Sequence, residues 1–89
     1  MLNRRSDSPA EKVVEVVQRL LAERSINRPI CSDDNLREVG LTSLDMVNLM
    51  LSVEAEFDLE IPEIEITPAN FRSISTVSSL VTVLLLNNR

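Results

Sequence analysis

The chain has 89 residues, 44% of them hydrophobic, which suits one small folded domain and argues against a disordered chain. With one cysteine and no histidine, it excludes disulfide frameworks, Cys/His zinc sites and every serine or cysteine mechanism that needs a histidine base. No apolar run is long enough to cross a membrane and residues 1–8 lack the apolar region of a signal peptide, so we expect a cytoplasmic protein without membrane contact.

The net charge of −5 is unevenly distributed along the chain. Residues 38–71 contain many Asp and Glu and no Lys or Arg. Such an acidic surface suits partners with basic patches and is unsuited to nucleic acid, and the lack of Trp and Tyr also argues against base stacking. Part of these carboxylates would be present merely to solvate a small domain.

The first predicted helix follows a short arm. Residues 1–7 are expected to be a mobile arm, and residues 8–89 the folded domain. Ser8, Pro9 and Glu11 form a helix start, with a cap, a proline at the first position and a glutamate at the capping-box spacing. The helix is predicted to reach about Arg24. Its apolar residues repeat at intervals of three and four: Val13, Val16, Val17, Leu20 and Leu21.

A long connection is predicted from Ser25 to Thr42. A loop of this length in a compact domain is either functional or held down by its own side chains. The apolar residues that can anchor it are Ile26, Ile30, Leu36, Val39 and Leu41. A short helical turn is plausible over 34–38. Cys31 is expected to be a small buried or half-buried residue.

The strongest helix start in the sequence lies just after Gly40, the only glycine. Thr42 and Asp45 have the spacing of a capping box, so we expect Ser43 to be the first helical residue, with an exposed hydroxyl beside unpaired amides. A helix N-terminus favours negative charge, so a phosphoester on Ser43 would be stabilised. The spacing by itself favours the simpler interpretation that Thr42 and Ser43 only cap the helix.

The helix that follows Ser43 carries two apolar stripes. The wider one is the predicted core face: Met46, Leu49, Met50, Val53 and Phe57. The narrower one is expected to face solvent or a partner: Leu44, Val47 and Leu51. A surface helix needs only one stripe, so the second indicates an interaction surface; burial of both stripes in a bundle is the alternative.

The residues after Phe57 nearly alternate between apolar and acidic, as an edge strand would. Because Pro62 interrupts this pattern and no second strand is available for pairing, we predict a loop over 58–66 that places its isoleucines on the core. A short helix is then predicted over 67–71, with Pro68 near its start.

The last predicted helix begins near Thr76 and ends at Asn87 and Asn88. Its apolar stripe is Val77, Leu80, Val81, Leu84 and Leu85. The predicted fold class is therefore all-α: a four-helix bundle of three longer helices and one short one, with a long loop between the first and second helices.

A family resemblance rests on a motif and its surroundings. The motif is Gly40-Leu41-Thr42-Ser43-Leu44, and the flanking residues that match are Asp34, Leu36, Glu54, Phe57, Ile61 and Pro62. Over about residues 10–87, the sequence resembles the acyl carrier and peptidyl carrier protein family, in which the serine of a Gly-x-Asp-Ser-Leu motif carries phosphopantetheine. The departure is Thr42, where the family most often has aspartate.

The resemblance implies that residues 8–89 are a carrier protein domain and that Ser43 is the attachment point of phosphopantetheine, delivered from coenzyme A by a phosphopantetheinyl transferase. The arm would hold an acyl group as a thioester for successive enzymes. The expected partners are a loading ligase or synthetase and acceptor enzymes with basic patches, and the carrier is expected to be a monomer. The implied partner-binding residues are an apolar strip of Leu44, Val47 and Leu51 and two partner-facing acids, Asp45 and Glu54.

The cargo is indicated only weakly. Residues 66–71 with Ser73 and Ile74 resemble peptidyl or aminoacyl carriers more than the fatty-acid type, and the length suggests a stand-alone carrier loaded by a separate ligase. An aminoacyl or specialised acyl cargo is therefore favoured. The alternatives are a fatty-acid-type acyl carrier and a non-carrier acidic adaptor that would not depend on Ser43. No catalytic constellation or metal site accompanies Ser43, so enzymatic activity is not expected.

Overall fold

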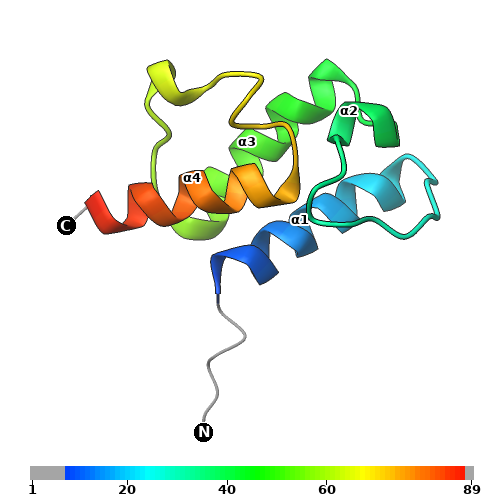
Figure 1. Ribbon diagram of the computed structural model, residues 1–89, viewed down its shortest axis with the longest axis horizontal. Coiled ribbons are helices and arrows are strands. Elements are labelled where there is room, and N and C mark those ends of the chain that lie inside the picture. Colours follow the sequence, from blue (N-terminus) through cyan, green and yellow to red (C-terminus); the bar gives the residue numbers. More distant parts are fainter. Residues whose placement is uncertain (1–7, 88–89) are drawn as a thin grey trace, which may run out of the picture.

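The computed structural model describes residues 8–87 (Figure 1). Its elements are α1 (Pro9–Glu23), α2 (Leu36–Val39), α3 (Ser43–Phe57), the 3-10 turn η2 (Glu63–Glu65) and α4 (Ile74–Asn87). The described part has no strand, and the predicted all-α class with three longer helices and one short one is confirmed, although the short helix is α2 and not the one predicted over 67–71. Within it, no helix combines the length and the apolar character that a bilayer span requires. The arm predicted for residues 1–7 and the helix end at Asn88 lie outside the described residues.

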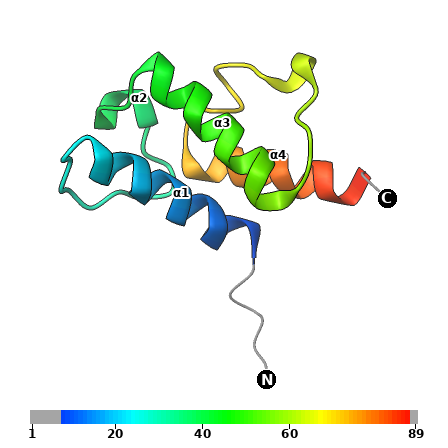
Figure 2. The same cartoon turned by 180° about the vertical axis from the view of Figure 1, so that it is seen from behind.

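α1 and α3 are antiparallel, and ion pairs join them near both ends. Arg24, directly after α1, pairs with Asp45 in the first turn of α3 at 2.8 Å. Lys12, near the start of α1, pairs with Glu56 near the end of α3 at 3.0 Å. α4 also packs against α1, and the two opposite views show the three longer helices grouped around one core (Figures 1 and 2).

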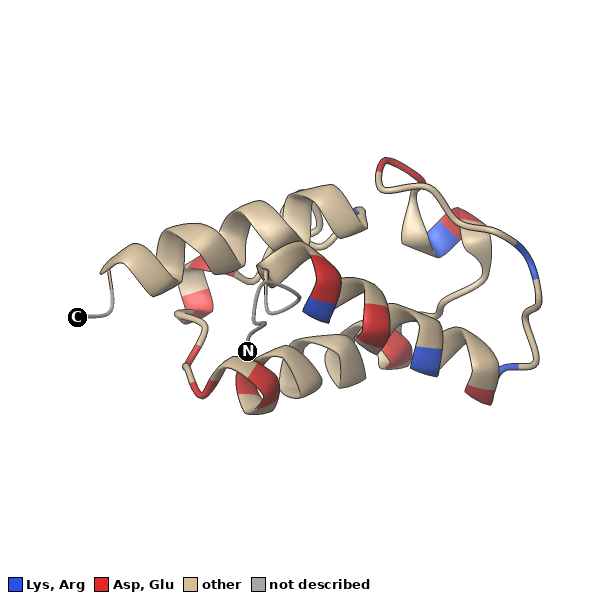
Figure 3. Cartoon of the chain, turned by 90° about the horizontal axis from the view of Figure 1, so that it is seen from below, with Lys and Arg blue, Asp and Glu red and all other residues tan. Residues whose placement is uncertain are grey.

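Most of the core consists of apolar positions that helical periodicity predicts, and Ile74 is a helical core residue that it did not. The core residues of the three longer helices are Val13, Val16, Val17, Leu20 and Leu21 of α1, Leu49 and Val53 of α3, and Ile74, Val77, Leu80 and Val81 of α4. Met46, Met50 and Phe57 pack partly buried against this core, so the wider α3 stripe is confirmed as the core face. Along α4 no residue is charged (Figure 3). Leu85 differs from the prediction, because it lies exposed near the end of that helix.

Side-chain caps set where the longer helices begin. Ser8 Oγ accepts from the amide of Glu11 at 3.3 Å, as predicted for α1. At α4, Ser73 Oγ accepts from the amide of Thr76, and Thr76 Oγ1 accepts from the amide of Ser73. This reciprocal cap starts α4 at Ile74, two residues before the predicted position.

The connection from α1 to α3 is held down as predicted, and its middle forms α2. Leu36, Val39 and Leu41 are buried. The amide of Leu36 donates to the carbonyl of Arg72 at 2.8 Å, which ties the connection to the segment before α4. The predicted helical turn is therefore confirmed and lies at Leu36–Val39.

Cys31 is exposed, so the prediction that it is buried or half-buried was wrong. Its amide donates to Asp34 Oδ2 at 2.9 Å and its carbonyl accepts from the amide of Asp34 at 3.0 Å. This tight turn is stabilised by polar contacts rather than by burial of the cysteine, so the side chain stays at the surface.

The segment after α3 is a loop, as predicted, but only one of its isoleucines reaches the core. Glu54 Oε2 accepts from the amide of Ile61 at 2.9 Å, and Ile61 is buried. The chain then turns outward through η2, which leaves Ile64 83% and Ile66 42% exposed. The prediction that the isoleucines pack on the core was therefore right for Ile61 and wrong for the other two.

The short helix predicted over 67–71 was wrong, because this stretch forms hydrogen-bonded turns. The amide of Phe71 donates to the carbonyl of Thr67, which makes a single helix-like turn. Asn70 Nδ2 donates back to the carbonyl of Glu65 at 2.8 Å. The next bond of such a helix, from the amide of Arg72 to the carbonyl of Pro68, is not made, so the turn is not extended.

Candidate functional site

Gly40 joins α2 to α3 with a backbone conformation that favours glycine. Its φ is 133°, and its amide donates to the carbonyl of Leu36. The amide of Leu41 donates to the same carbonyl at 3.1 Å, and Leu41 is buried. The chain thus reverses sharply between the two helices, and α3 begins three residues after the glycine.

The first turn of α3 contains the predicted capping box. Thr42 Oγ1 accepts from the amide of Asp45 at 3.2 Å, and Asp45 Oδ2 accepts from the amide of Thr42 at 2.8 Å. The Thr42 hydroxyl also donates to Asp45 Oδ2 at 3.0 Å. These contacts fix the residues on both sides of Ser43.

Arg24 adds a contact that the sequence did not indicate. Its Nε donates to Asp45 Oδ2 at 2.8 Å, its Nη2 to Asp45 Oδ1 at 3.1 Å, and the same Nη2 to Thr42 Oγ1 at 3.3 Å. The backbone hydrogen bond from Thr42, followed by the side-chain hydrogen bond from Arg24, holds the pKa of Asp45 below its ordinary value, while burial opposes the shift. The start of α3 is therefore anchored to the end of α1 by a charged fork.

Ser43 occupies the first position of α3 and is exposed, as predicted. Within residues 8–87, the structure records no hydrogen bond for its hydroxyl. The described part also contains no group of His, Cys, Asp and Glu side chains that could hold a metal ion. The hydroxyl is thus accessible, and no side chain of the described residues is hydrogen-bonded to it.

The narrower apolar stripe of α3 lies at the surface. Leu44 is 65% exposed, Val47 47% and Leu51 51%. Large apolar side chains exposed in a row on one helix are typical of an interaction surface. The exposure predicted for these three residues is confirmed, whereas their contact with partners stays a prediction.

The two acids predicted to face partners make internal contacts instead. Asp45 is only 5% exposed, and its carboxylate is occupied by Thr42 and Arg24. Glu54 is half-buried, and its Oε2 accepts from the amide of Ile61. Asp45 therefore does not face a partner, because its charge is used to anchor the start of α3. Glu54 has one carboxylate oxygen engaged with the loop after α3 and is not fully buried, so its contact with partners stays a prediction.

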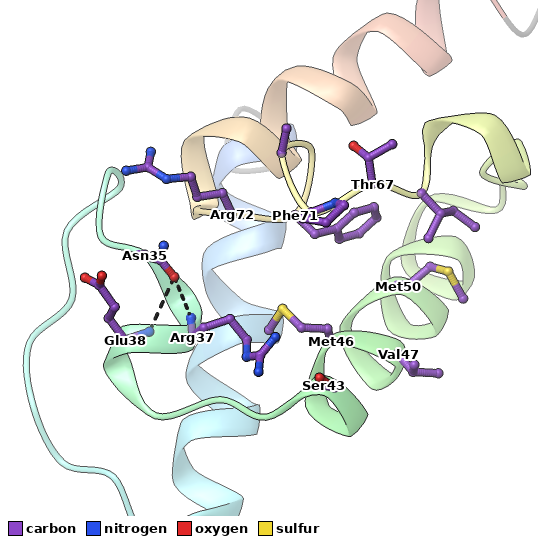
Figure 4. Close-up of a pocket in the computed structure, with 13 residues that line it drawn as sticks. Asn35, Arg37, Glu38, Ser43, Met46, Val47, Met50, Thr67, Phe71 and Arg72 are labelled. Atoms are coloured by element: carbon purple, nitrogen blue, oxygen red, sulfur yellow. Dashed lines mark hydrogen bonds between the residues drawn. The ribbon is translucent and has the colours of Figure 1, made fainter.

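A groove of about 750 Å³ opens beside Ser43 (Figure 4). One wall is α2, with Arg37, and the facing wall is the 66–72 segment, with Phe71. Met46 and Met50 of α3 line the groove between these walls. The groove thus has mainly apolar side chains next to the exposed serine and a cation close by.

Sequence reasoning missed Arg24, Arg37 and the groove. Arg24 stands 21 positions before its partner Asp45, and only the antiparallel packing of α1 on α3 brings the two together. The one available signal for Arg37 was its place as the last cation before the acidic stretch 38–71. No local pattern marks the groove, because separate segments form its walls.

Two curated proteins of Bradyrhizobium diazoefficiens are similar to the chain. Aminoacyl carrier protein 1 is 46% identical over 70 residues, which are 79% of this chain and 78% of the relative. Aminoacyl carrier protein 2 is 43% identical over 70 residues. The mitochondrial acyl carrier protein of Saccharomyces cerevisiae is 34% identical over 64 residues, 68% of this chain and 51% of the relative.

Solved structures agree with these similarities. The chain superimposes with a TM-score of 0.79 and 43% identity on a chain of a crystal structure of Bradyrhizobium japonicum glycine:[carrier protein] ligase, complexed with its cognate carrier protein and an analogue of glycyl adenylate. The match covers 86% of this chain and 99% of that chain. A second structure, of the same ligase with glycylated carrier protein, gives a TM-score of 0.77.

The fold and the exposed serine define a small helical carrier protein. Residues 11–84 match the family model of the phosphopantetheine attachment site. The chain belongs to this family, and its cofactor is phosphopantetheine. The local chemistry fits such a group, because an exposed hydroxyl at a helix N-terminus adjoins an apolar groove and a cation.

Proposed function

We propose that Ser43 carries phosphopantetheine and that the holo-protein bears an aminoacyl group as a thioester for transfer to partner enzymes. The observation that carries this proposal is the exposed Ser43 hydroxyl at the first position of α3, in a chain that matches the attachment-site family. When bound, the group supplies a thiol on a flexible arm, which forms the thioester and presents it to successive enzymes.

The N-terminus of α3 is a favourable place for the phosphate group that the modification adds to Ser43. The first amides of a helix have no partner within it, and they lie close to a phosphate on the first residue. During modification, Ser43 Oγ forms a bond to the phosphorus nearer the pantetheine in coenzyme A. The bond from that phosphorus to the leaving adenosine bisphosphate breaks, and the serine proton passes to the transferase. The capping box and Arg24 hold the residues on both sides of Ser43, so the backbone that carries the hydroxyl is fixed.

The cargo is an amino acid, with glycine as the first candidate. Two relatives are named aminoacyl carrier proteins, and the matched structures contain a glycine:[carrier protein] ligase, one of them with glycylated carrier protein. Loading would use an aminoacyl adenylate, from which the arm's thiol displaces AMP. The match to a mitochondrial acyl carrier protein is weaker, and it supports an acyl cargo as the second candidate.

The partners are a phosphopantetheinyl transferase, a loading ligase and acceptor enzymes. The exposed strip Leu44, Val47 and Leu51 supports their docking on α3, next to the arm. The carrier itself is not an enzyme in this proposal, since Ser43 has no base beside it. Monomeric state and cytoplasmic localisation stay predictions.

The test is the intact mass of the purified protein before and after incubation with coenzyme A and a broad-specificity transferase. Wild type and the Ser79→Ala control, which alters an exposed serine of α4, should each gain one phosphopantetheine increment. Ser43→Ala should gain none. The holo-protein is then incubated with ATP, glycine and the Bradyrhizobium ligase, and a further glycyl increment is expected.

Each outcome has a separate meaning. An increment on Ser43→Ala would show that another residue is modified. Absence of any increment on wild type, with a transferase active on another carrier, would overturn the proposal and favour a non-carrier adaptor. Formation of the holo-protein without a glycyl increment, but with an acyl increment from an acyl ligase, would replace the aminoacyl cargo by the second candidate.

A further inference from the structure

Ser43 lies at the edge of a groove whose apolar side chains come from two different segments. Met46 and Met50 project from α3, and Phe71 comes from the segment that faces them (Figure 4). The groove has a volume of about 750 Å³ and extends from α2 to the 66–72 segment. It is therefore large enough to hold part of an extended chain attached to the serine.

Arg37 is the cation best placed to act at this edge. Figure 4 shows its side chain extending from α2 towards Met46 and Ser43, whereas the Arg72 and Glu38 side chains point away from this region. Within residues 8–87, the structure gives the Arg37 guanidinium no ion pair and no hydrogen bond.

The backbone of Arg37 is fixed although its side chain is exposed. Its amide donates to Asn35 Oδ1 at 2.9 Å, which caps the start of α2. The amide of Leu36 in turn donates to the carbonyl of Arg72, so α2 is held against the other wall of the groove. Arg37 thus projects from a rigid position on one side of the groove.

We propose that Arg37 binds the phosphodiester of the phosphopantetheine arm on Ser43 and directs the first part of the arm along Met46 and Met50. This inference rests on the proposed function. A guanidinium matches two phosphate oxygens with parallel N–H donors, and such charge-assisted bonds are stronger than neutral ones. The methyl and methylene groups of pantetheine are apolar, so contact with the groove removes them from water.

The negative charge of the chain makes a contact between Arg37 and the phosphate important. The net charge is −5, and residues 38–71, which include Ser43, contain no cation, so the chain as a whole repels an added phosphate. Arg37 counteracts this repulsion at the one place where the phosphate must lie. Because Arg37 is exposed, its contact with the phosphate is weakened by salt.

The test uses methyl NMR, because the chain has three methionines and two of them line the groove. Wild type, Arg37→Gln, Arg37→Lys and the control Arg19→Gln, which removes an exposed charge on α1, are labelled at the methionine methyl groups. Each is converted to the holo-form, verified by intact mass. The ³¹P signal of the phosphodiester is followed in the same samples at low and high salt.

In wild type and Arg19→Gln, we expect the Met46 and Met50 signals to shift on conversion to the holo-form, and the ³¹P signal to move with salt. Arg37→Gln should lose most of both effects, and Arg37→Lys should retain a part, since it keeps the charge without the fork.

Identical methyl and ³¹P behaviour in wild type and Arg37→Gln would overturn the inference. So would methyl signals that do not respond in the wild-type holo-protein. A mass increment on wild type but none on Arg37→Gln would overturn it as well, in favour of a contact with the transferase. Absence of the increment on wild type would instead be the failure of the proposed function.

Discussion

The guanidinium of Arg24 binds both carboxylate oxygens of Asp45, with distances of 2.8 Å from Nε to Oδ2 and 3.1 Å from Nη2 to Oδ1. Arg24 follows the last residue of α1, and Asp45 lies in the first turn of α3. The contact therefore joins two helix ends, and Ser43 lies between Asp45 and the capping residue Thr42.

Replacement of Asp45 by Asn should lower the free energy of unfolding by about 1–3 kcal/mol. The neutral amide leaves Arg24 without its anion and supplies only one acceptor atom for the bonds that two carboxylate oxygens now accept. Urea unfolding measures the effect, with the exposed Glu60→Gln as a control of equal charge change. An equal midpoint for both variants would contradict this assignment.

The same carboxylate should make stability depend on acidity. The pKa of Asp45 in the folded chain lies below its ordinary value of 3.8, so the unfolded chain takes up the proton at higher pH than the folded chain does. Its stabilising effect is fully present above the ordinary value and is lost as the pH falls through the lowered folded value. Urea unfolding of wild type and Asp45→Asn at neutral and acidic pH should show their difference shrinking on acidification. A constant difference would refute the linkage.

Substitution of Gly40 by Ala should destabilise the fold by about 1–3 kcal/mol. An added Cβ would lie 2.8 Å from Ile26 Cδ1, and φ would remain at 133°. Since Cδ1 is the end of a flexible side chain that can move, the backbone conformation is the main cost. The double variant Gly40→Ala/Ile26→Val should therefore recover little stability in thermal unfolding. Full recovery would show that crowding is the cause.

Substitution of two leucines on α3 should have separate effects, one on stability and the other on partner binding. Leu49 is fully buried, and Leu49→Ala should cost about 2–5 kcal/mol of unfolding free energy. Leu51 is 51% exposed, and Leu51→Ala should change stability by no more than about 0.5 kcal/mol. If the exposed strip docks partners, Leu51→Ala raises the KM for loading by the glycine ligase. Unchanged loading kinetics in this variant would exclude Leu51 from the docking surface.

Local sequence patterns predicted the beginning of α3 well, because capping is a contact between near neighbours. Thr42 and Asp45 are three residues apart, and their hydrogen bonds follow from that spacing. The same reasoning failed at 67–71, where a proline and a threonine predicted a helix. There, a hydrogen bond from Asn70 back to Glu65 and a distant one between Leu36 and Arg72 accompany a backbone of turns instead.

Exposure of apolar side chains could likewise be predicted in a helix but not in an irregular loop. Helical periodicity separated Leu49 from Leu51, since a rotation of about 100° per residue puts them on different faces. No periodicity distinguishes Ile61 from Ile64, because the backbone between them is irregular and a hydrogen bond to Glu54 selects the one that is buried.

The sequence by itself determined the three longer helices, most of their core faces and the exposed Ser43, because these depend on periodicity and on contacts within a few residues. Only the tertiary structure decided that Asp45 is an anchor rather than a docking residue, since Arg24 reaches it from 21 positions away. It also decided that Arg37 and Phe71 face one groove beside the serine. Contacts of this kind depend on how helices pack, and packing is a property of the whole core rather than of any local stretch.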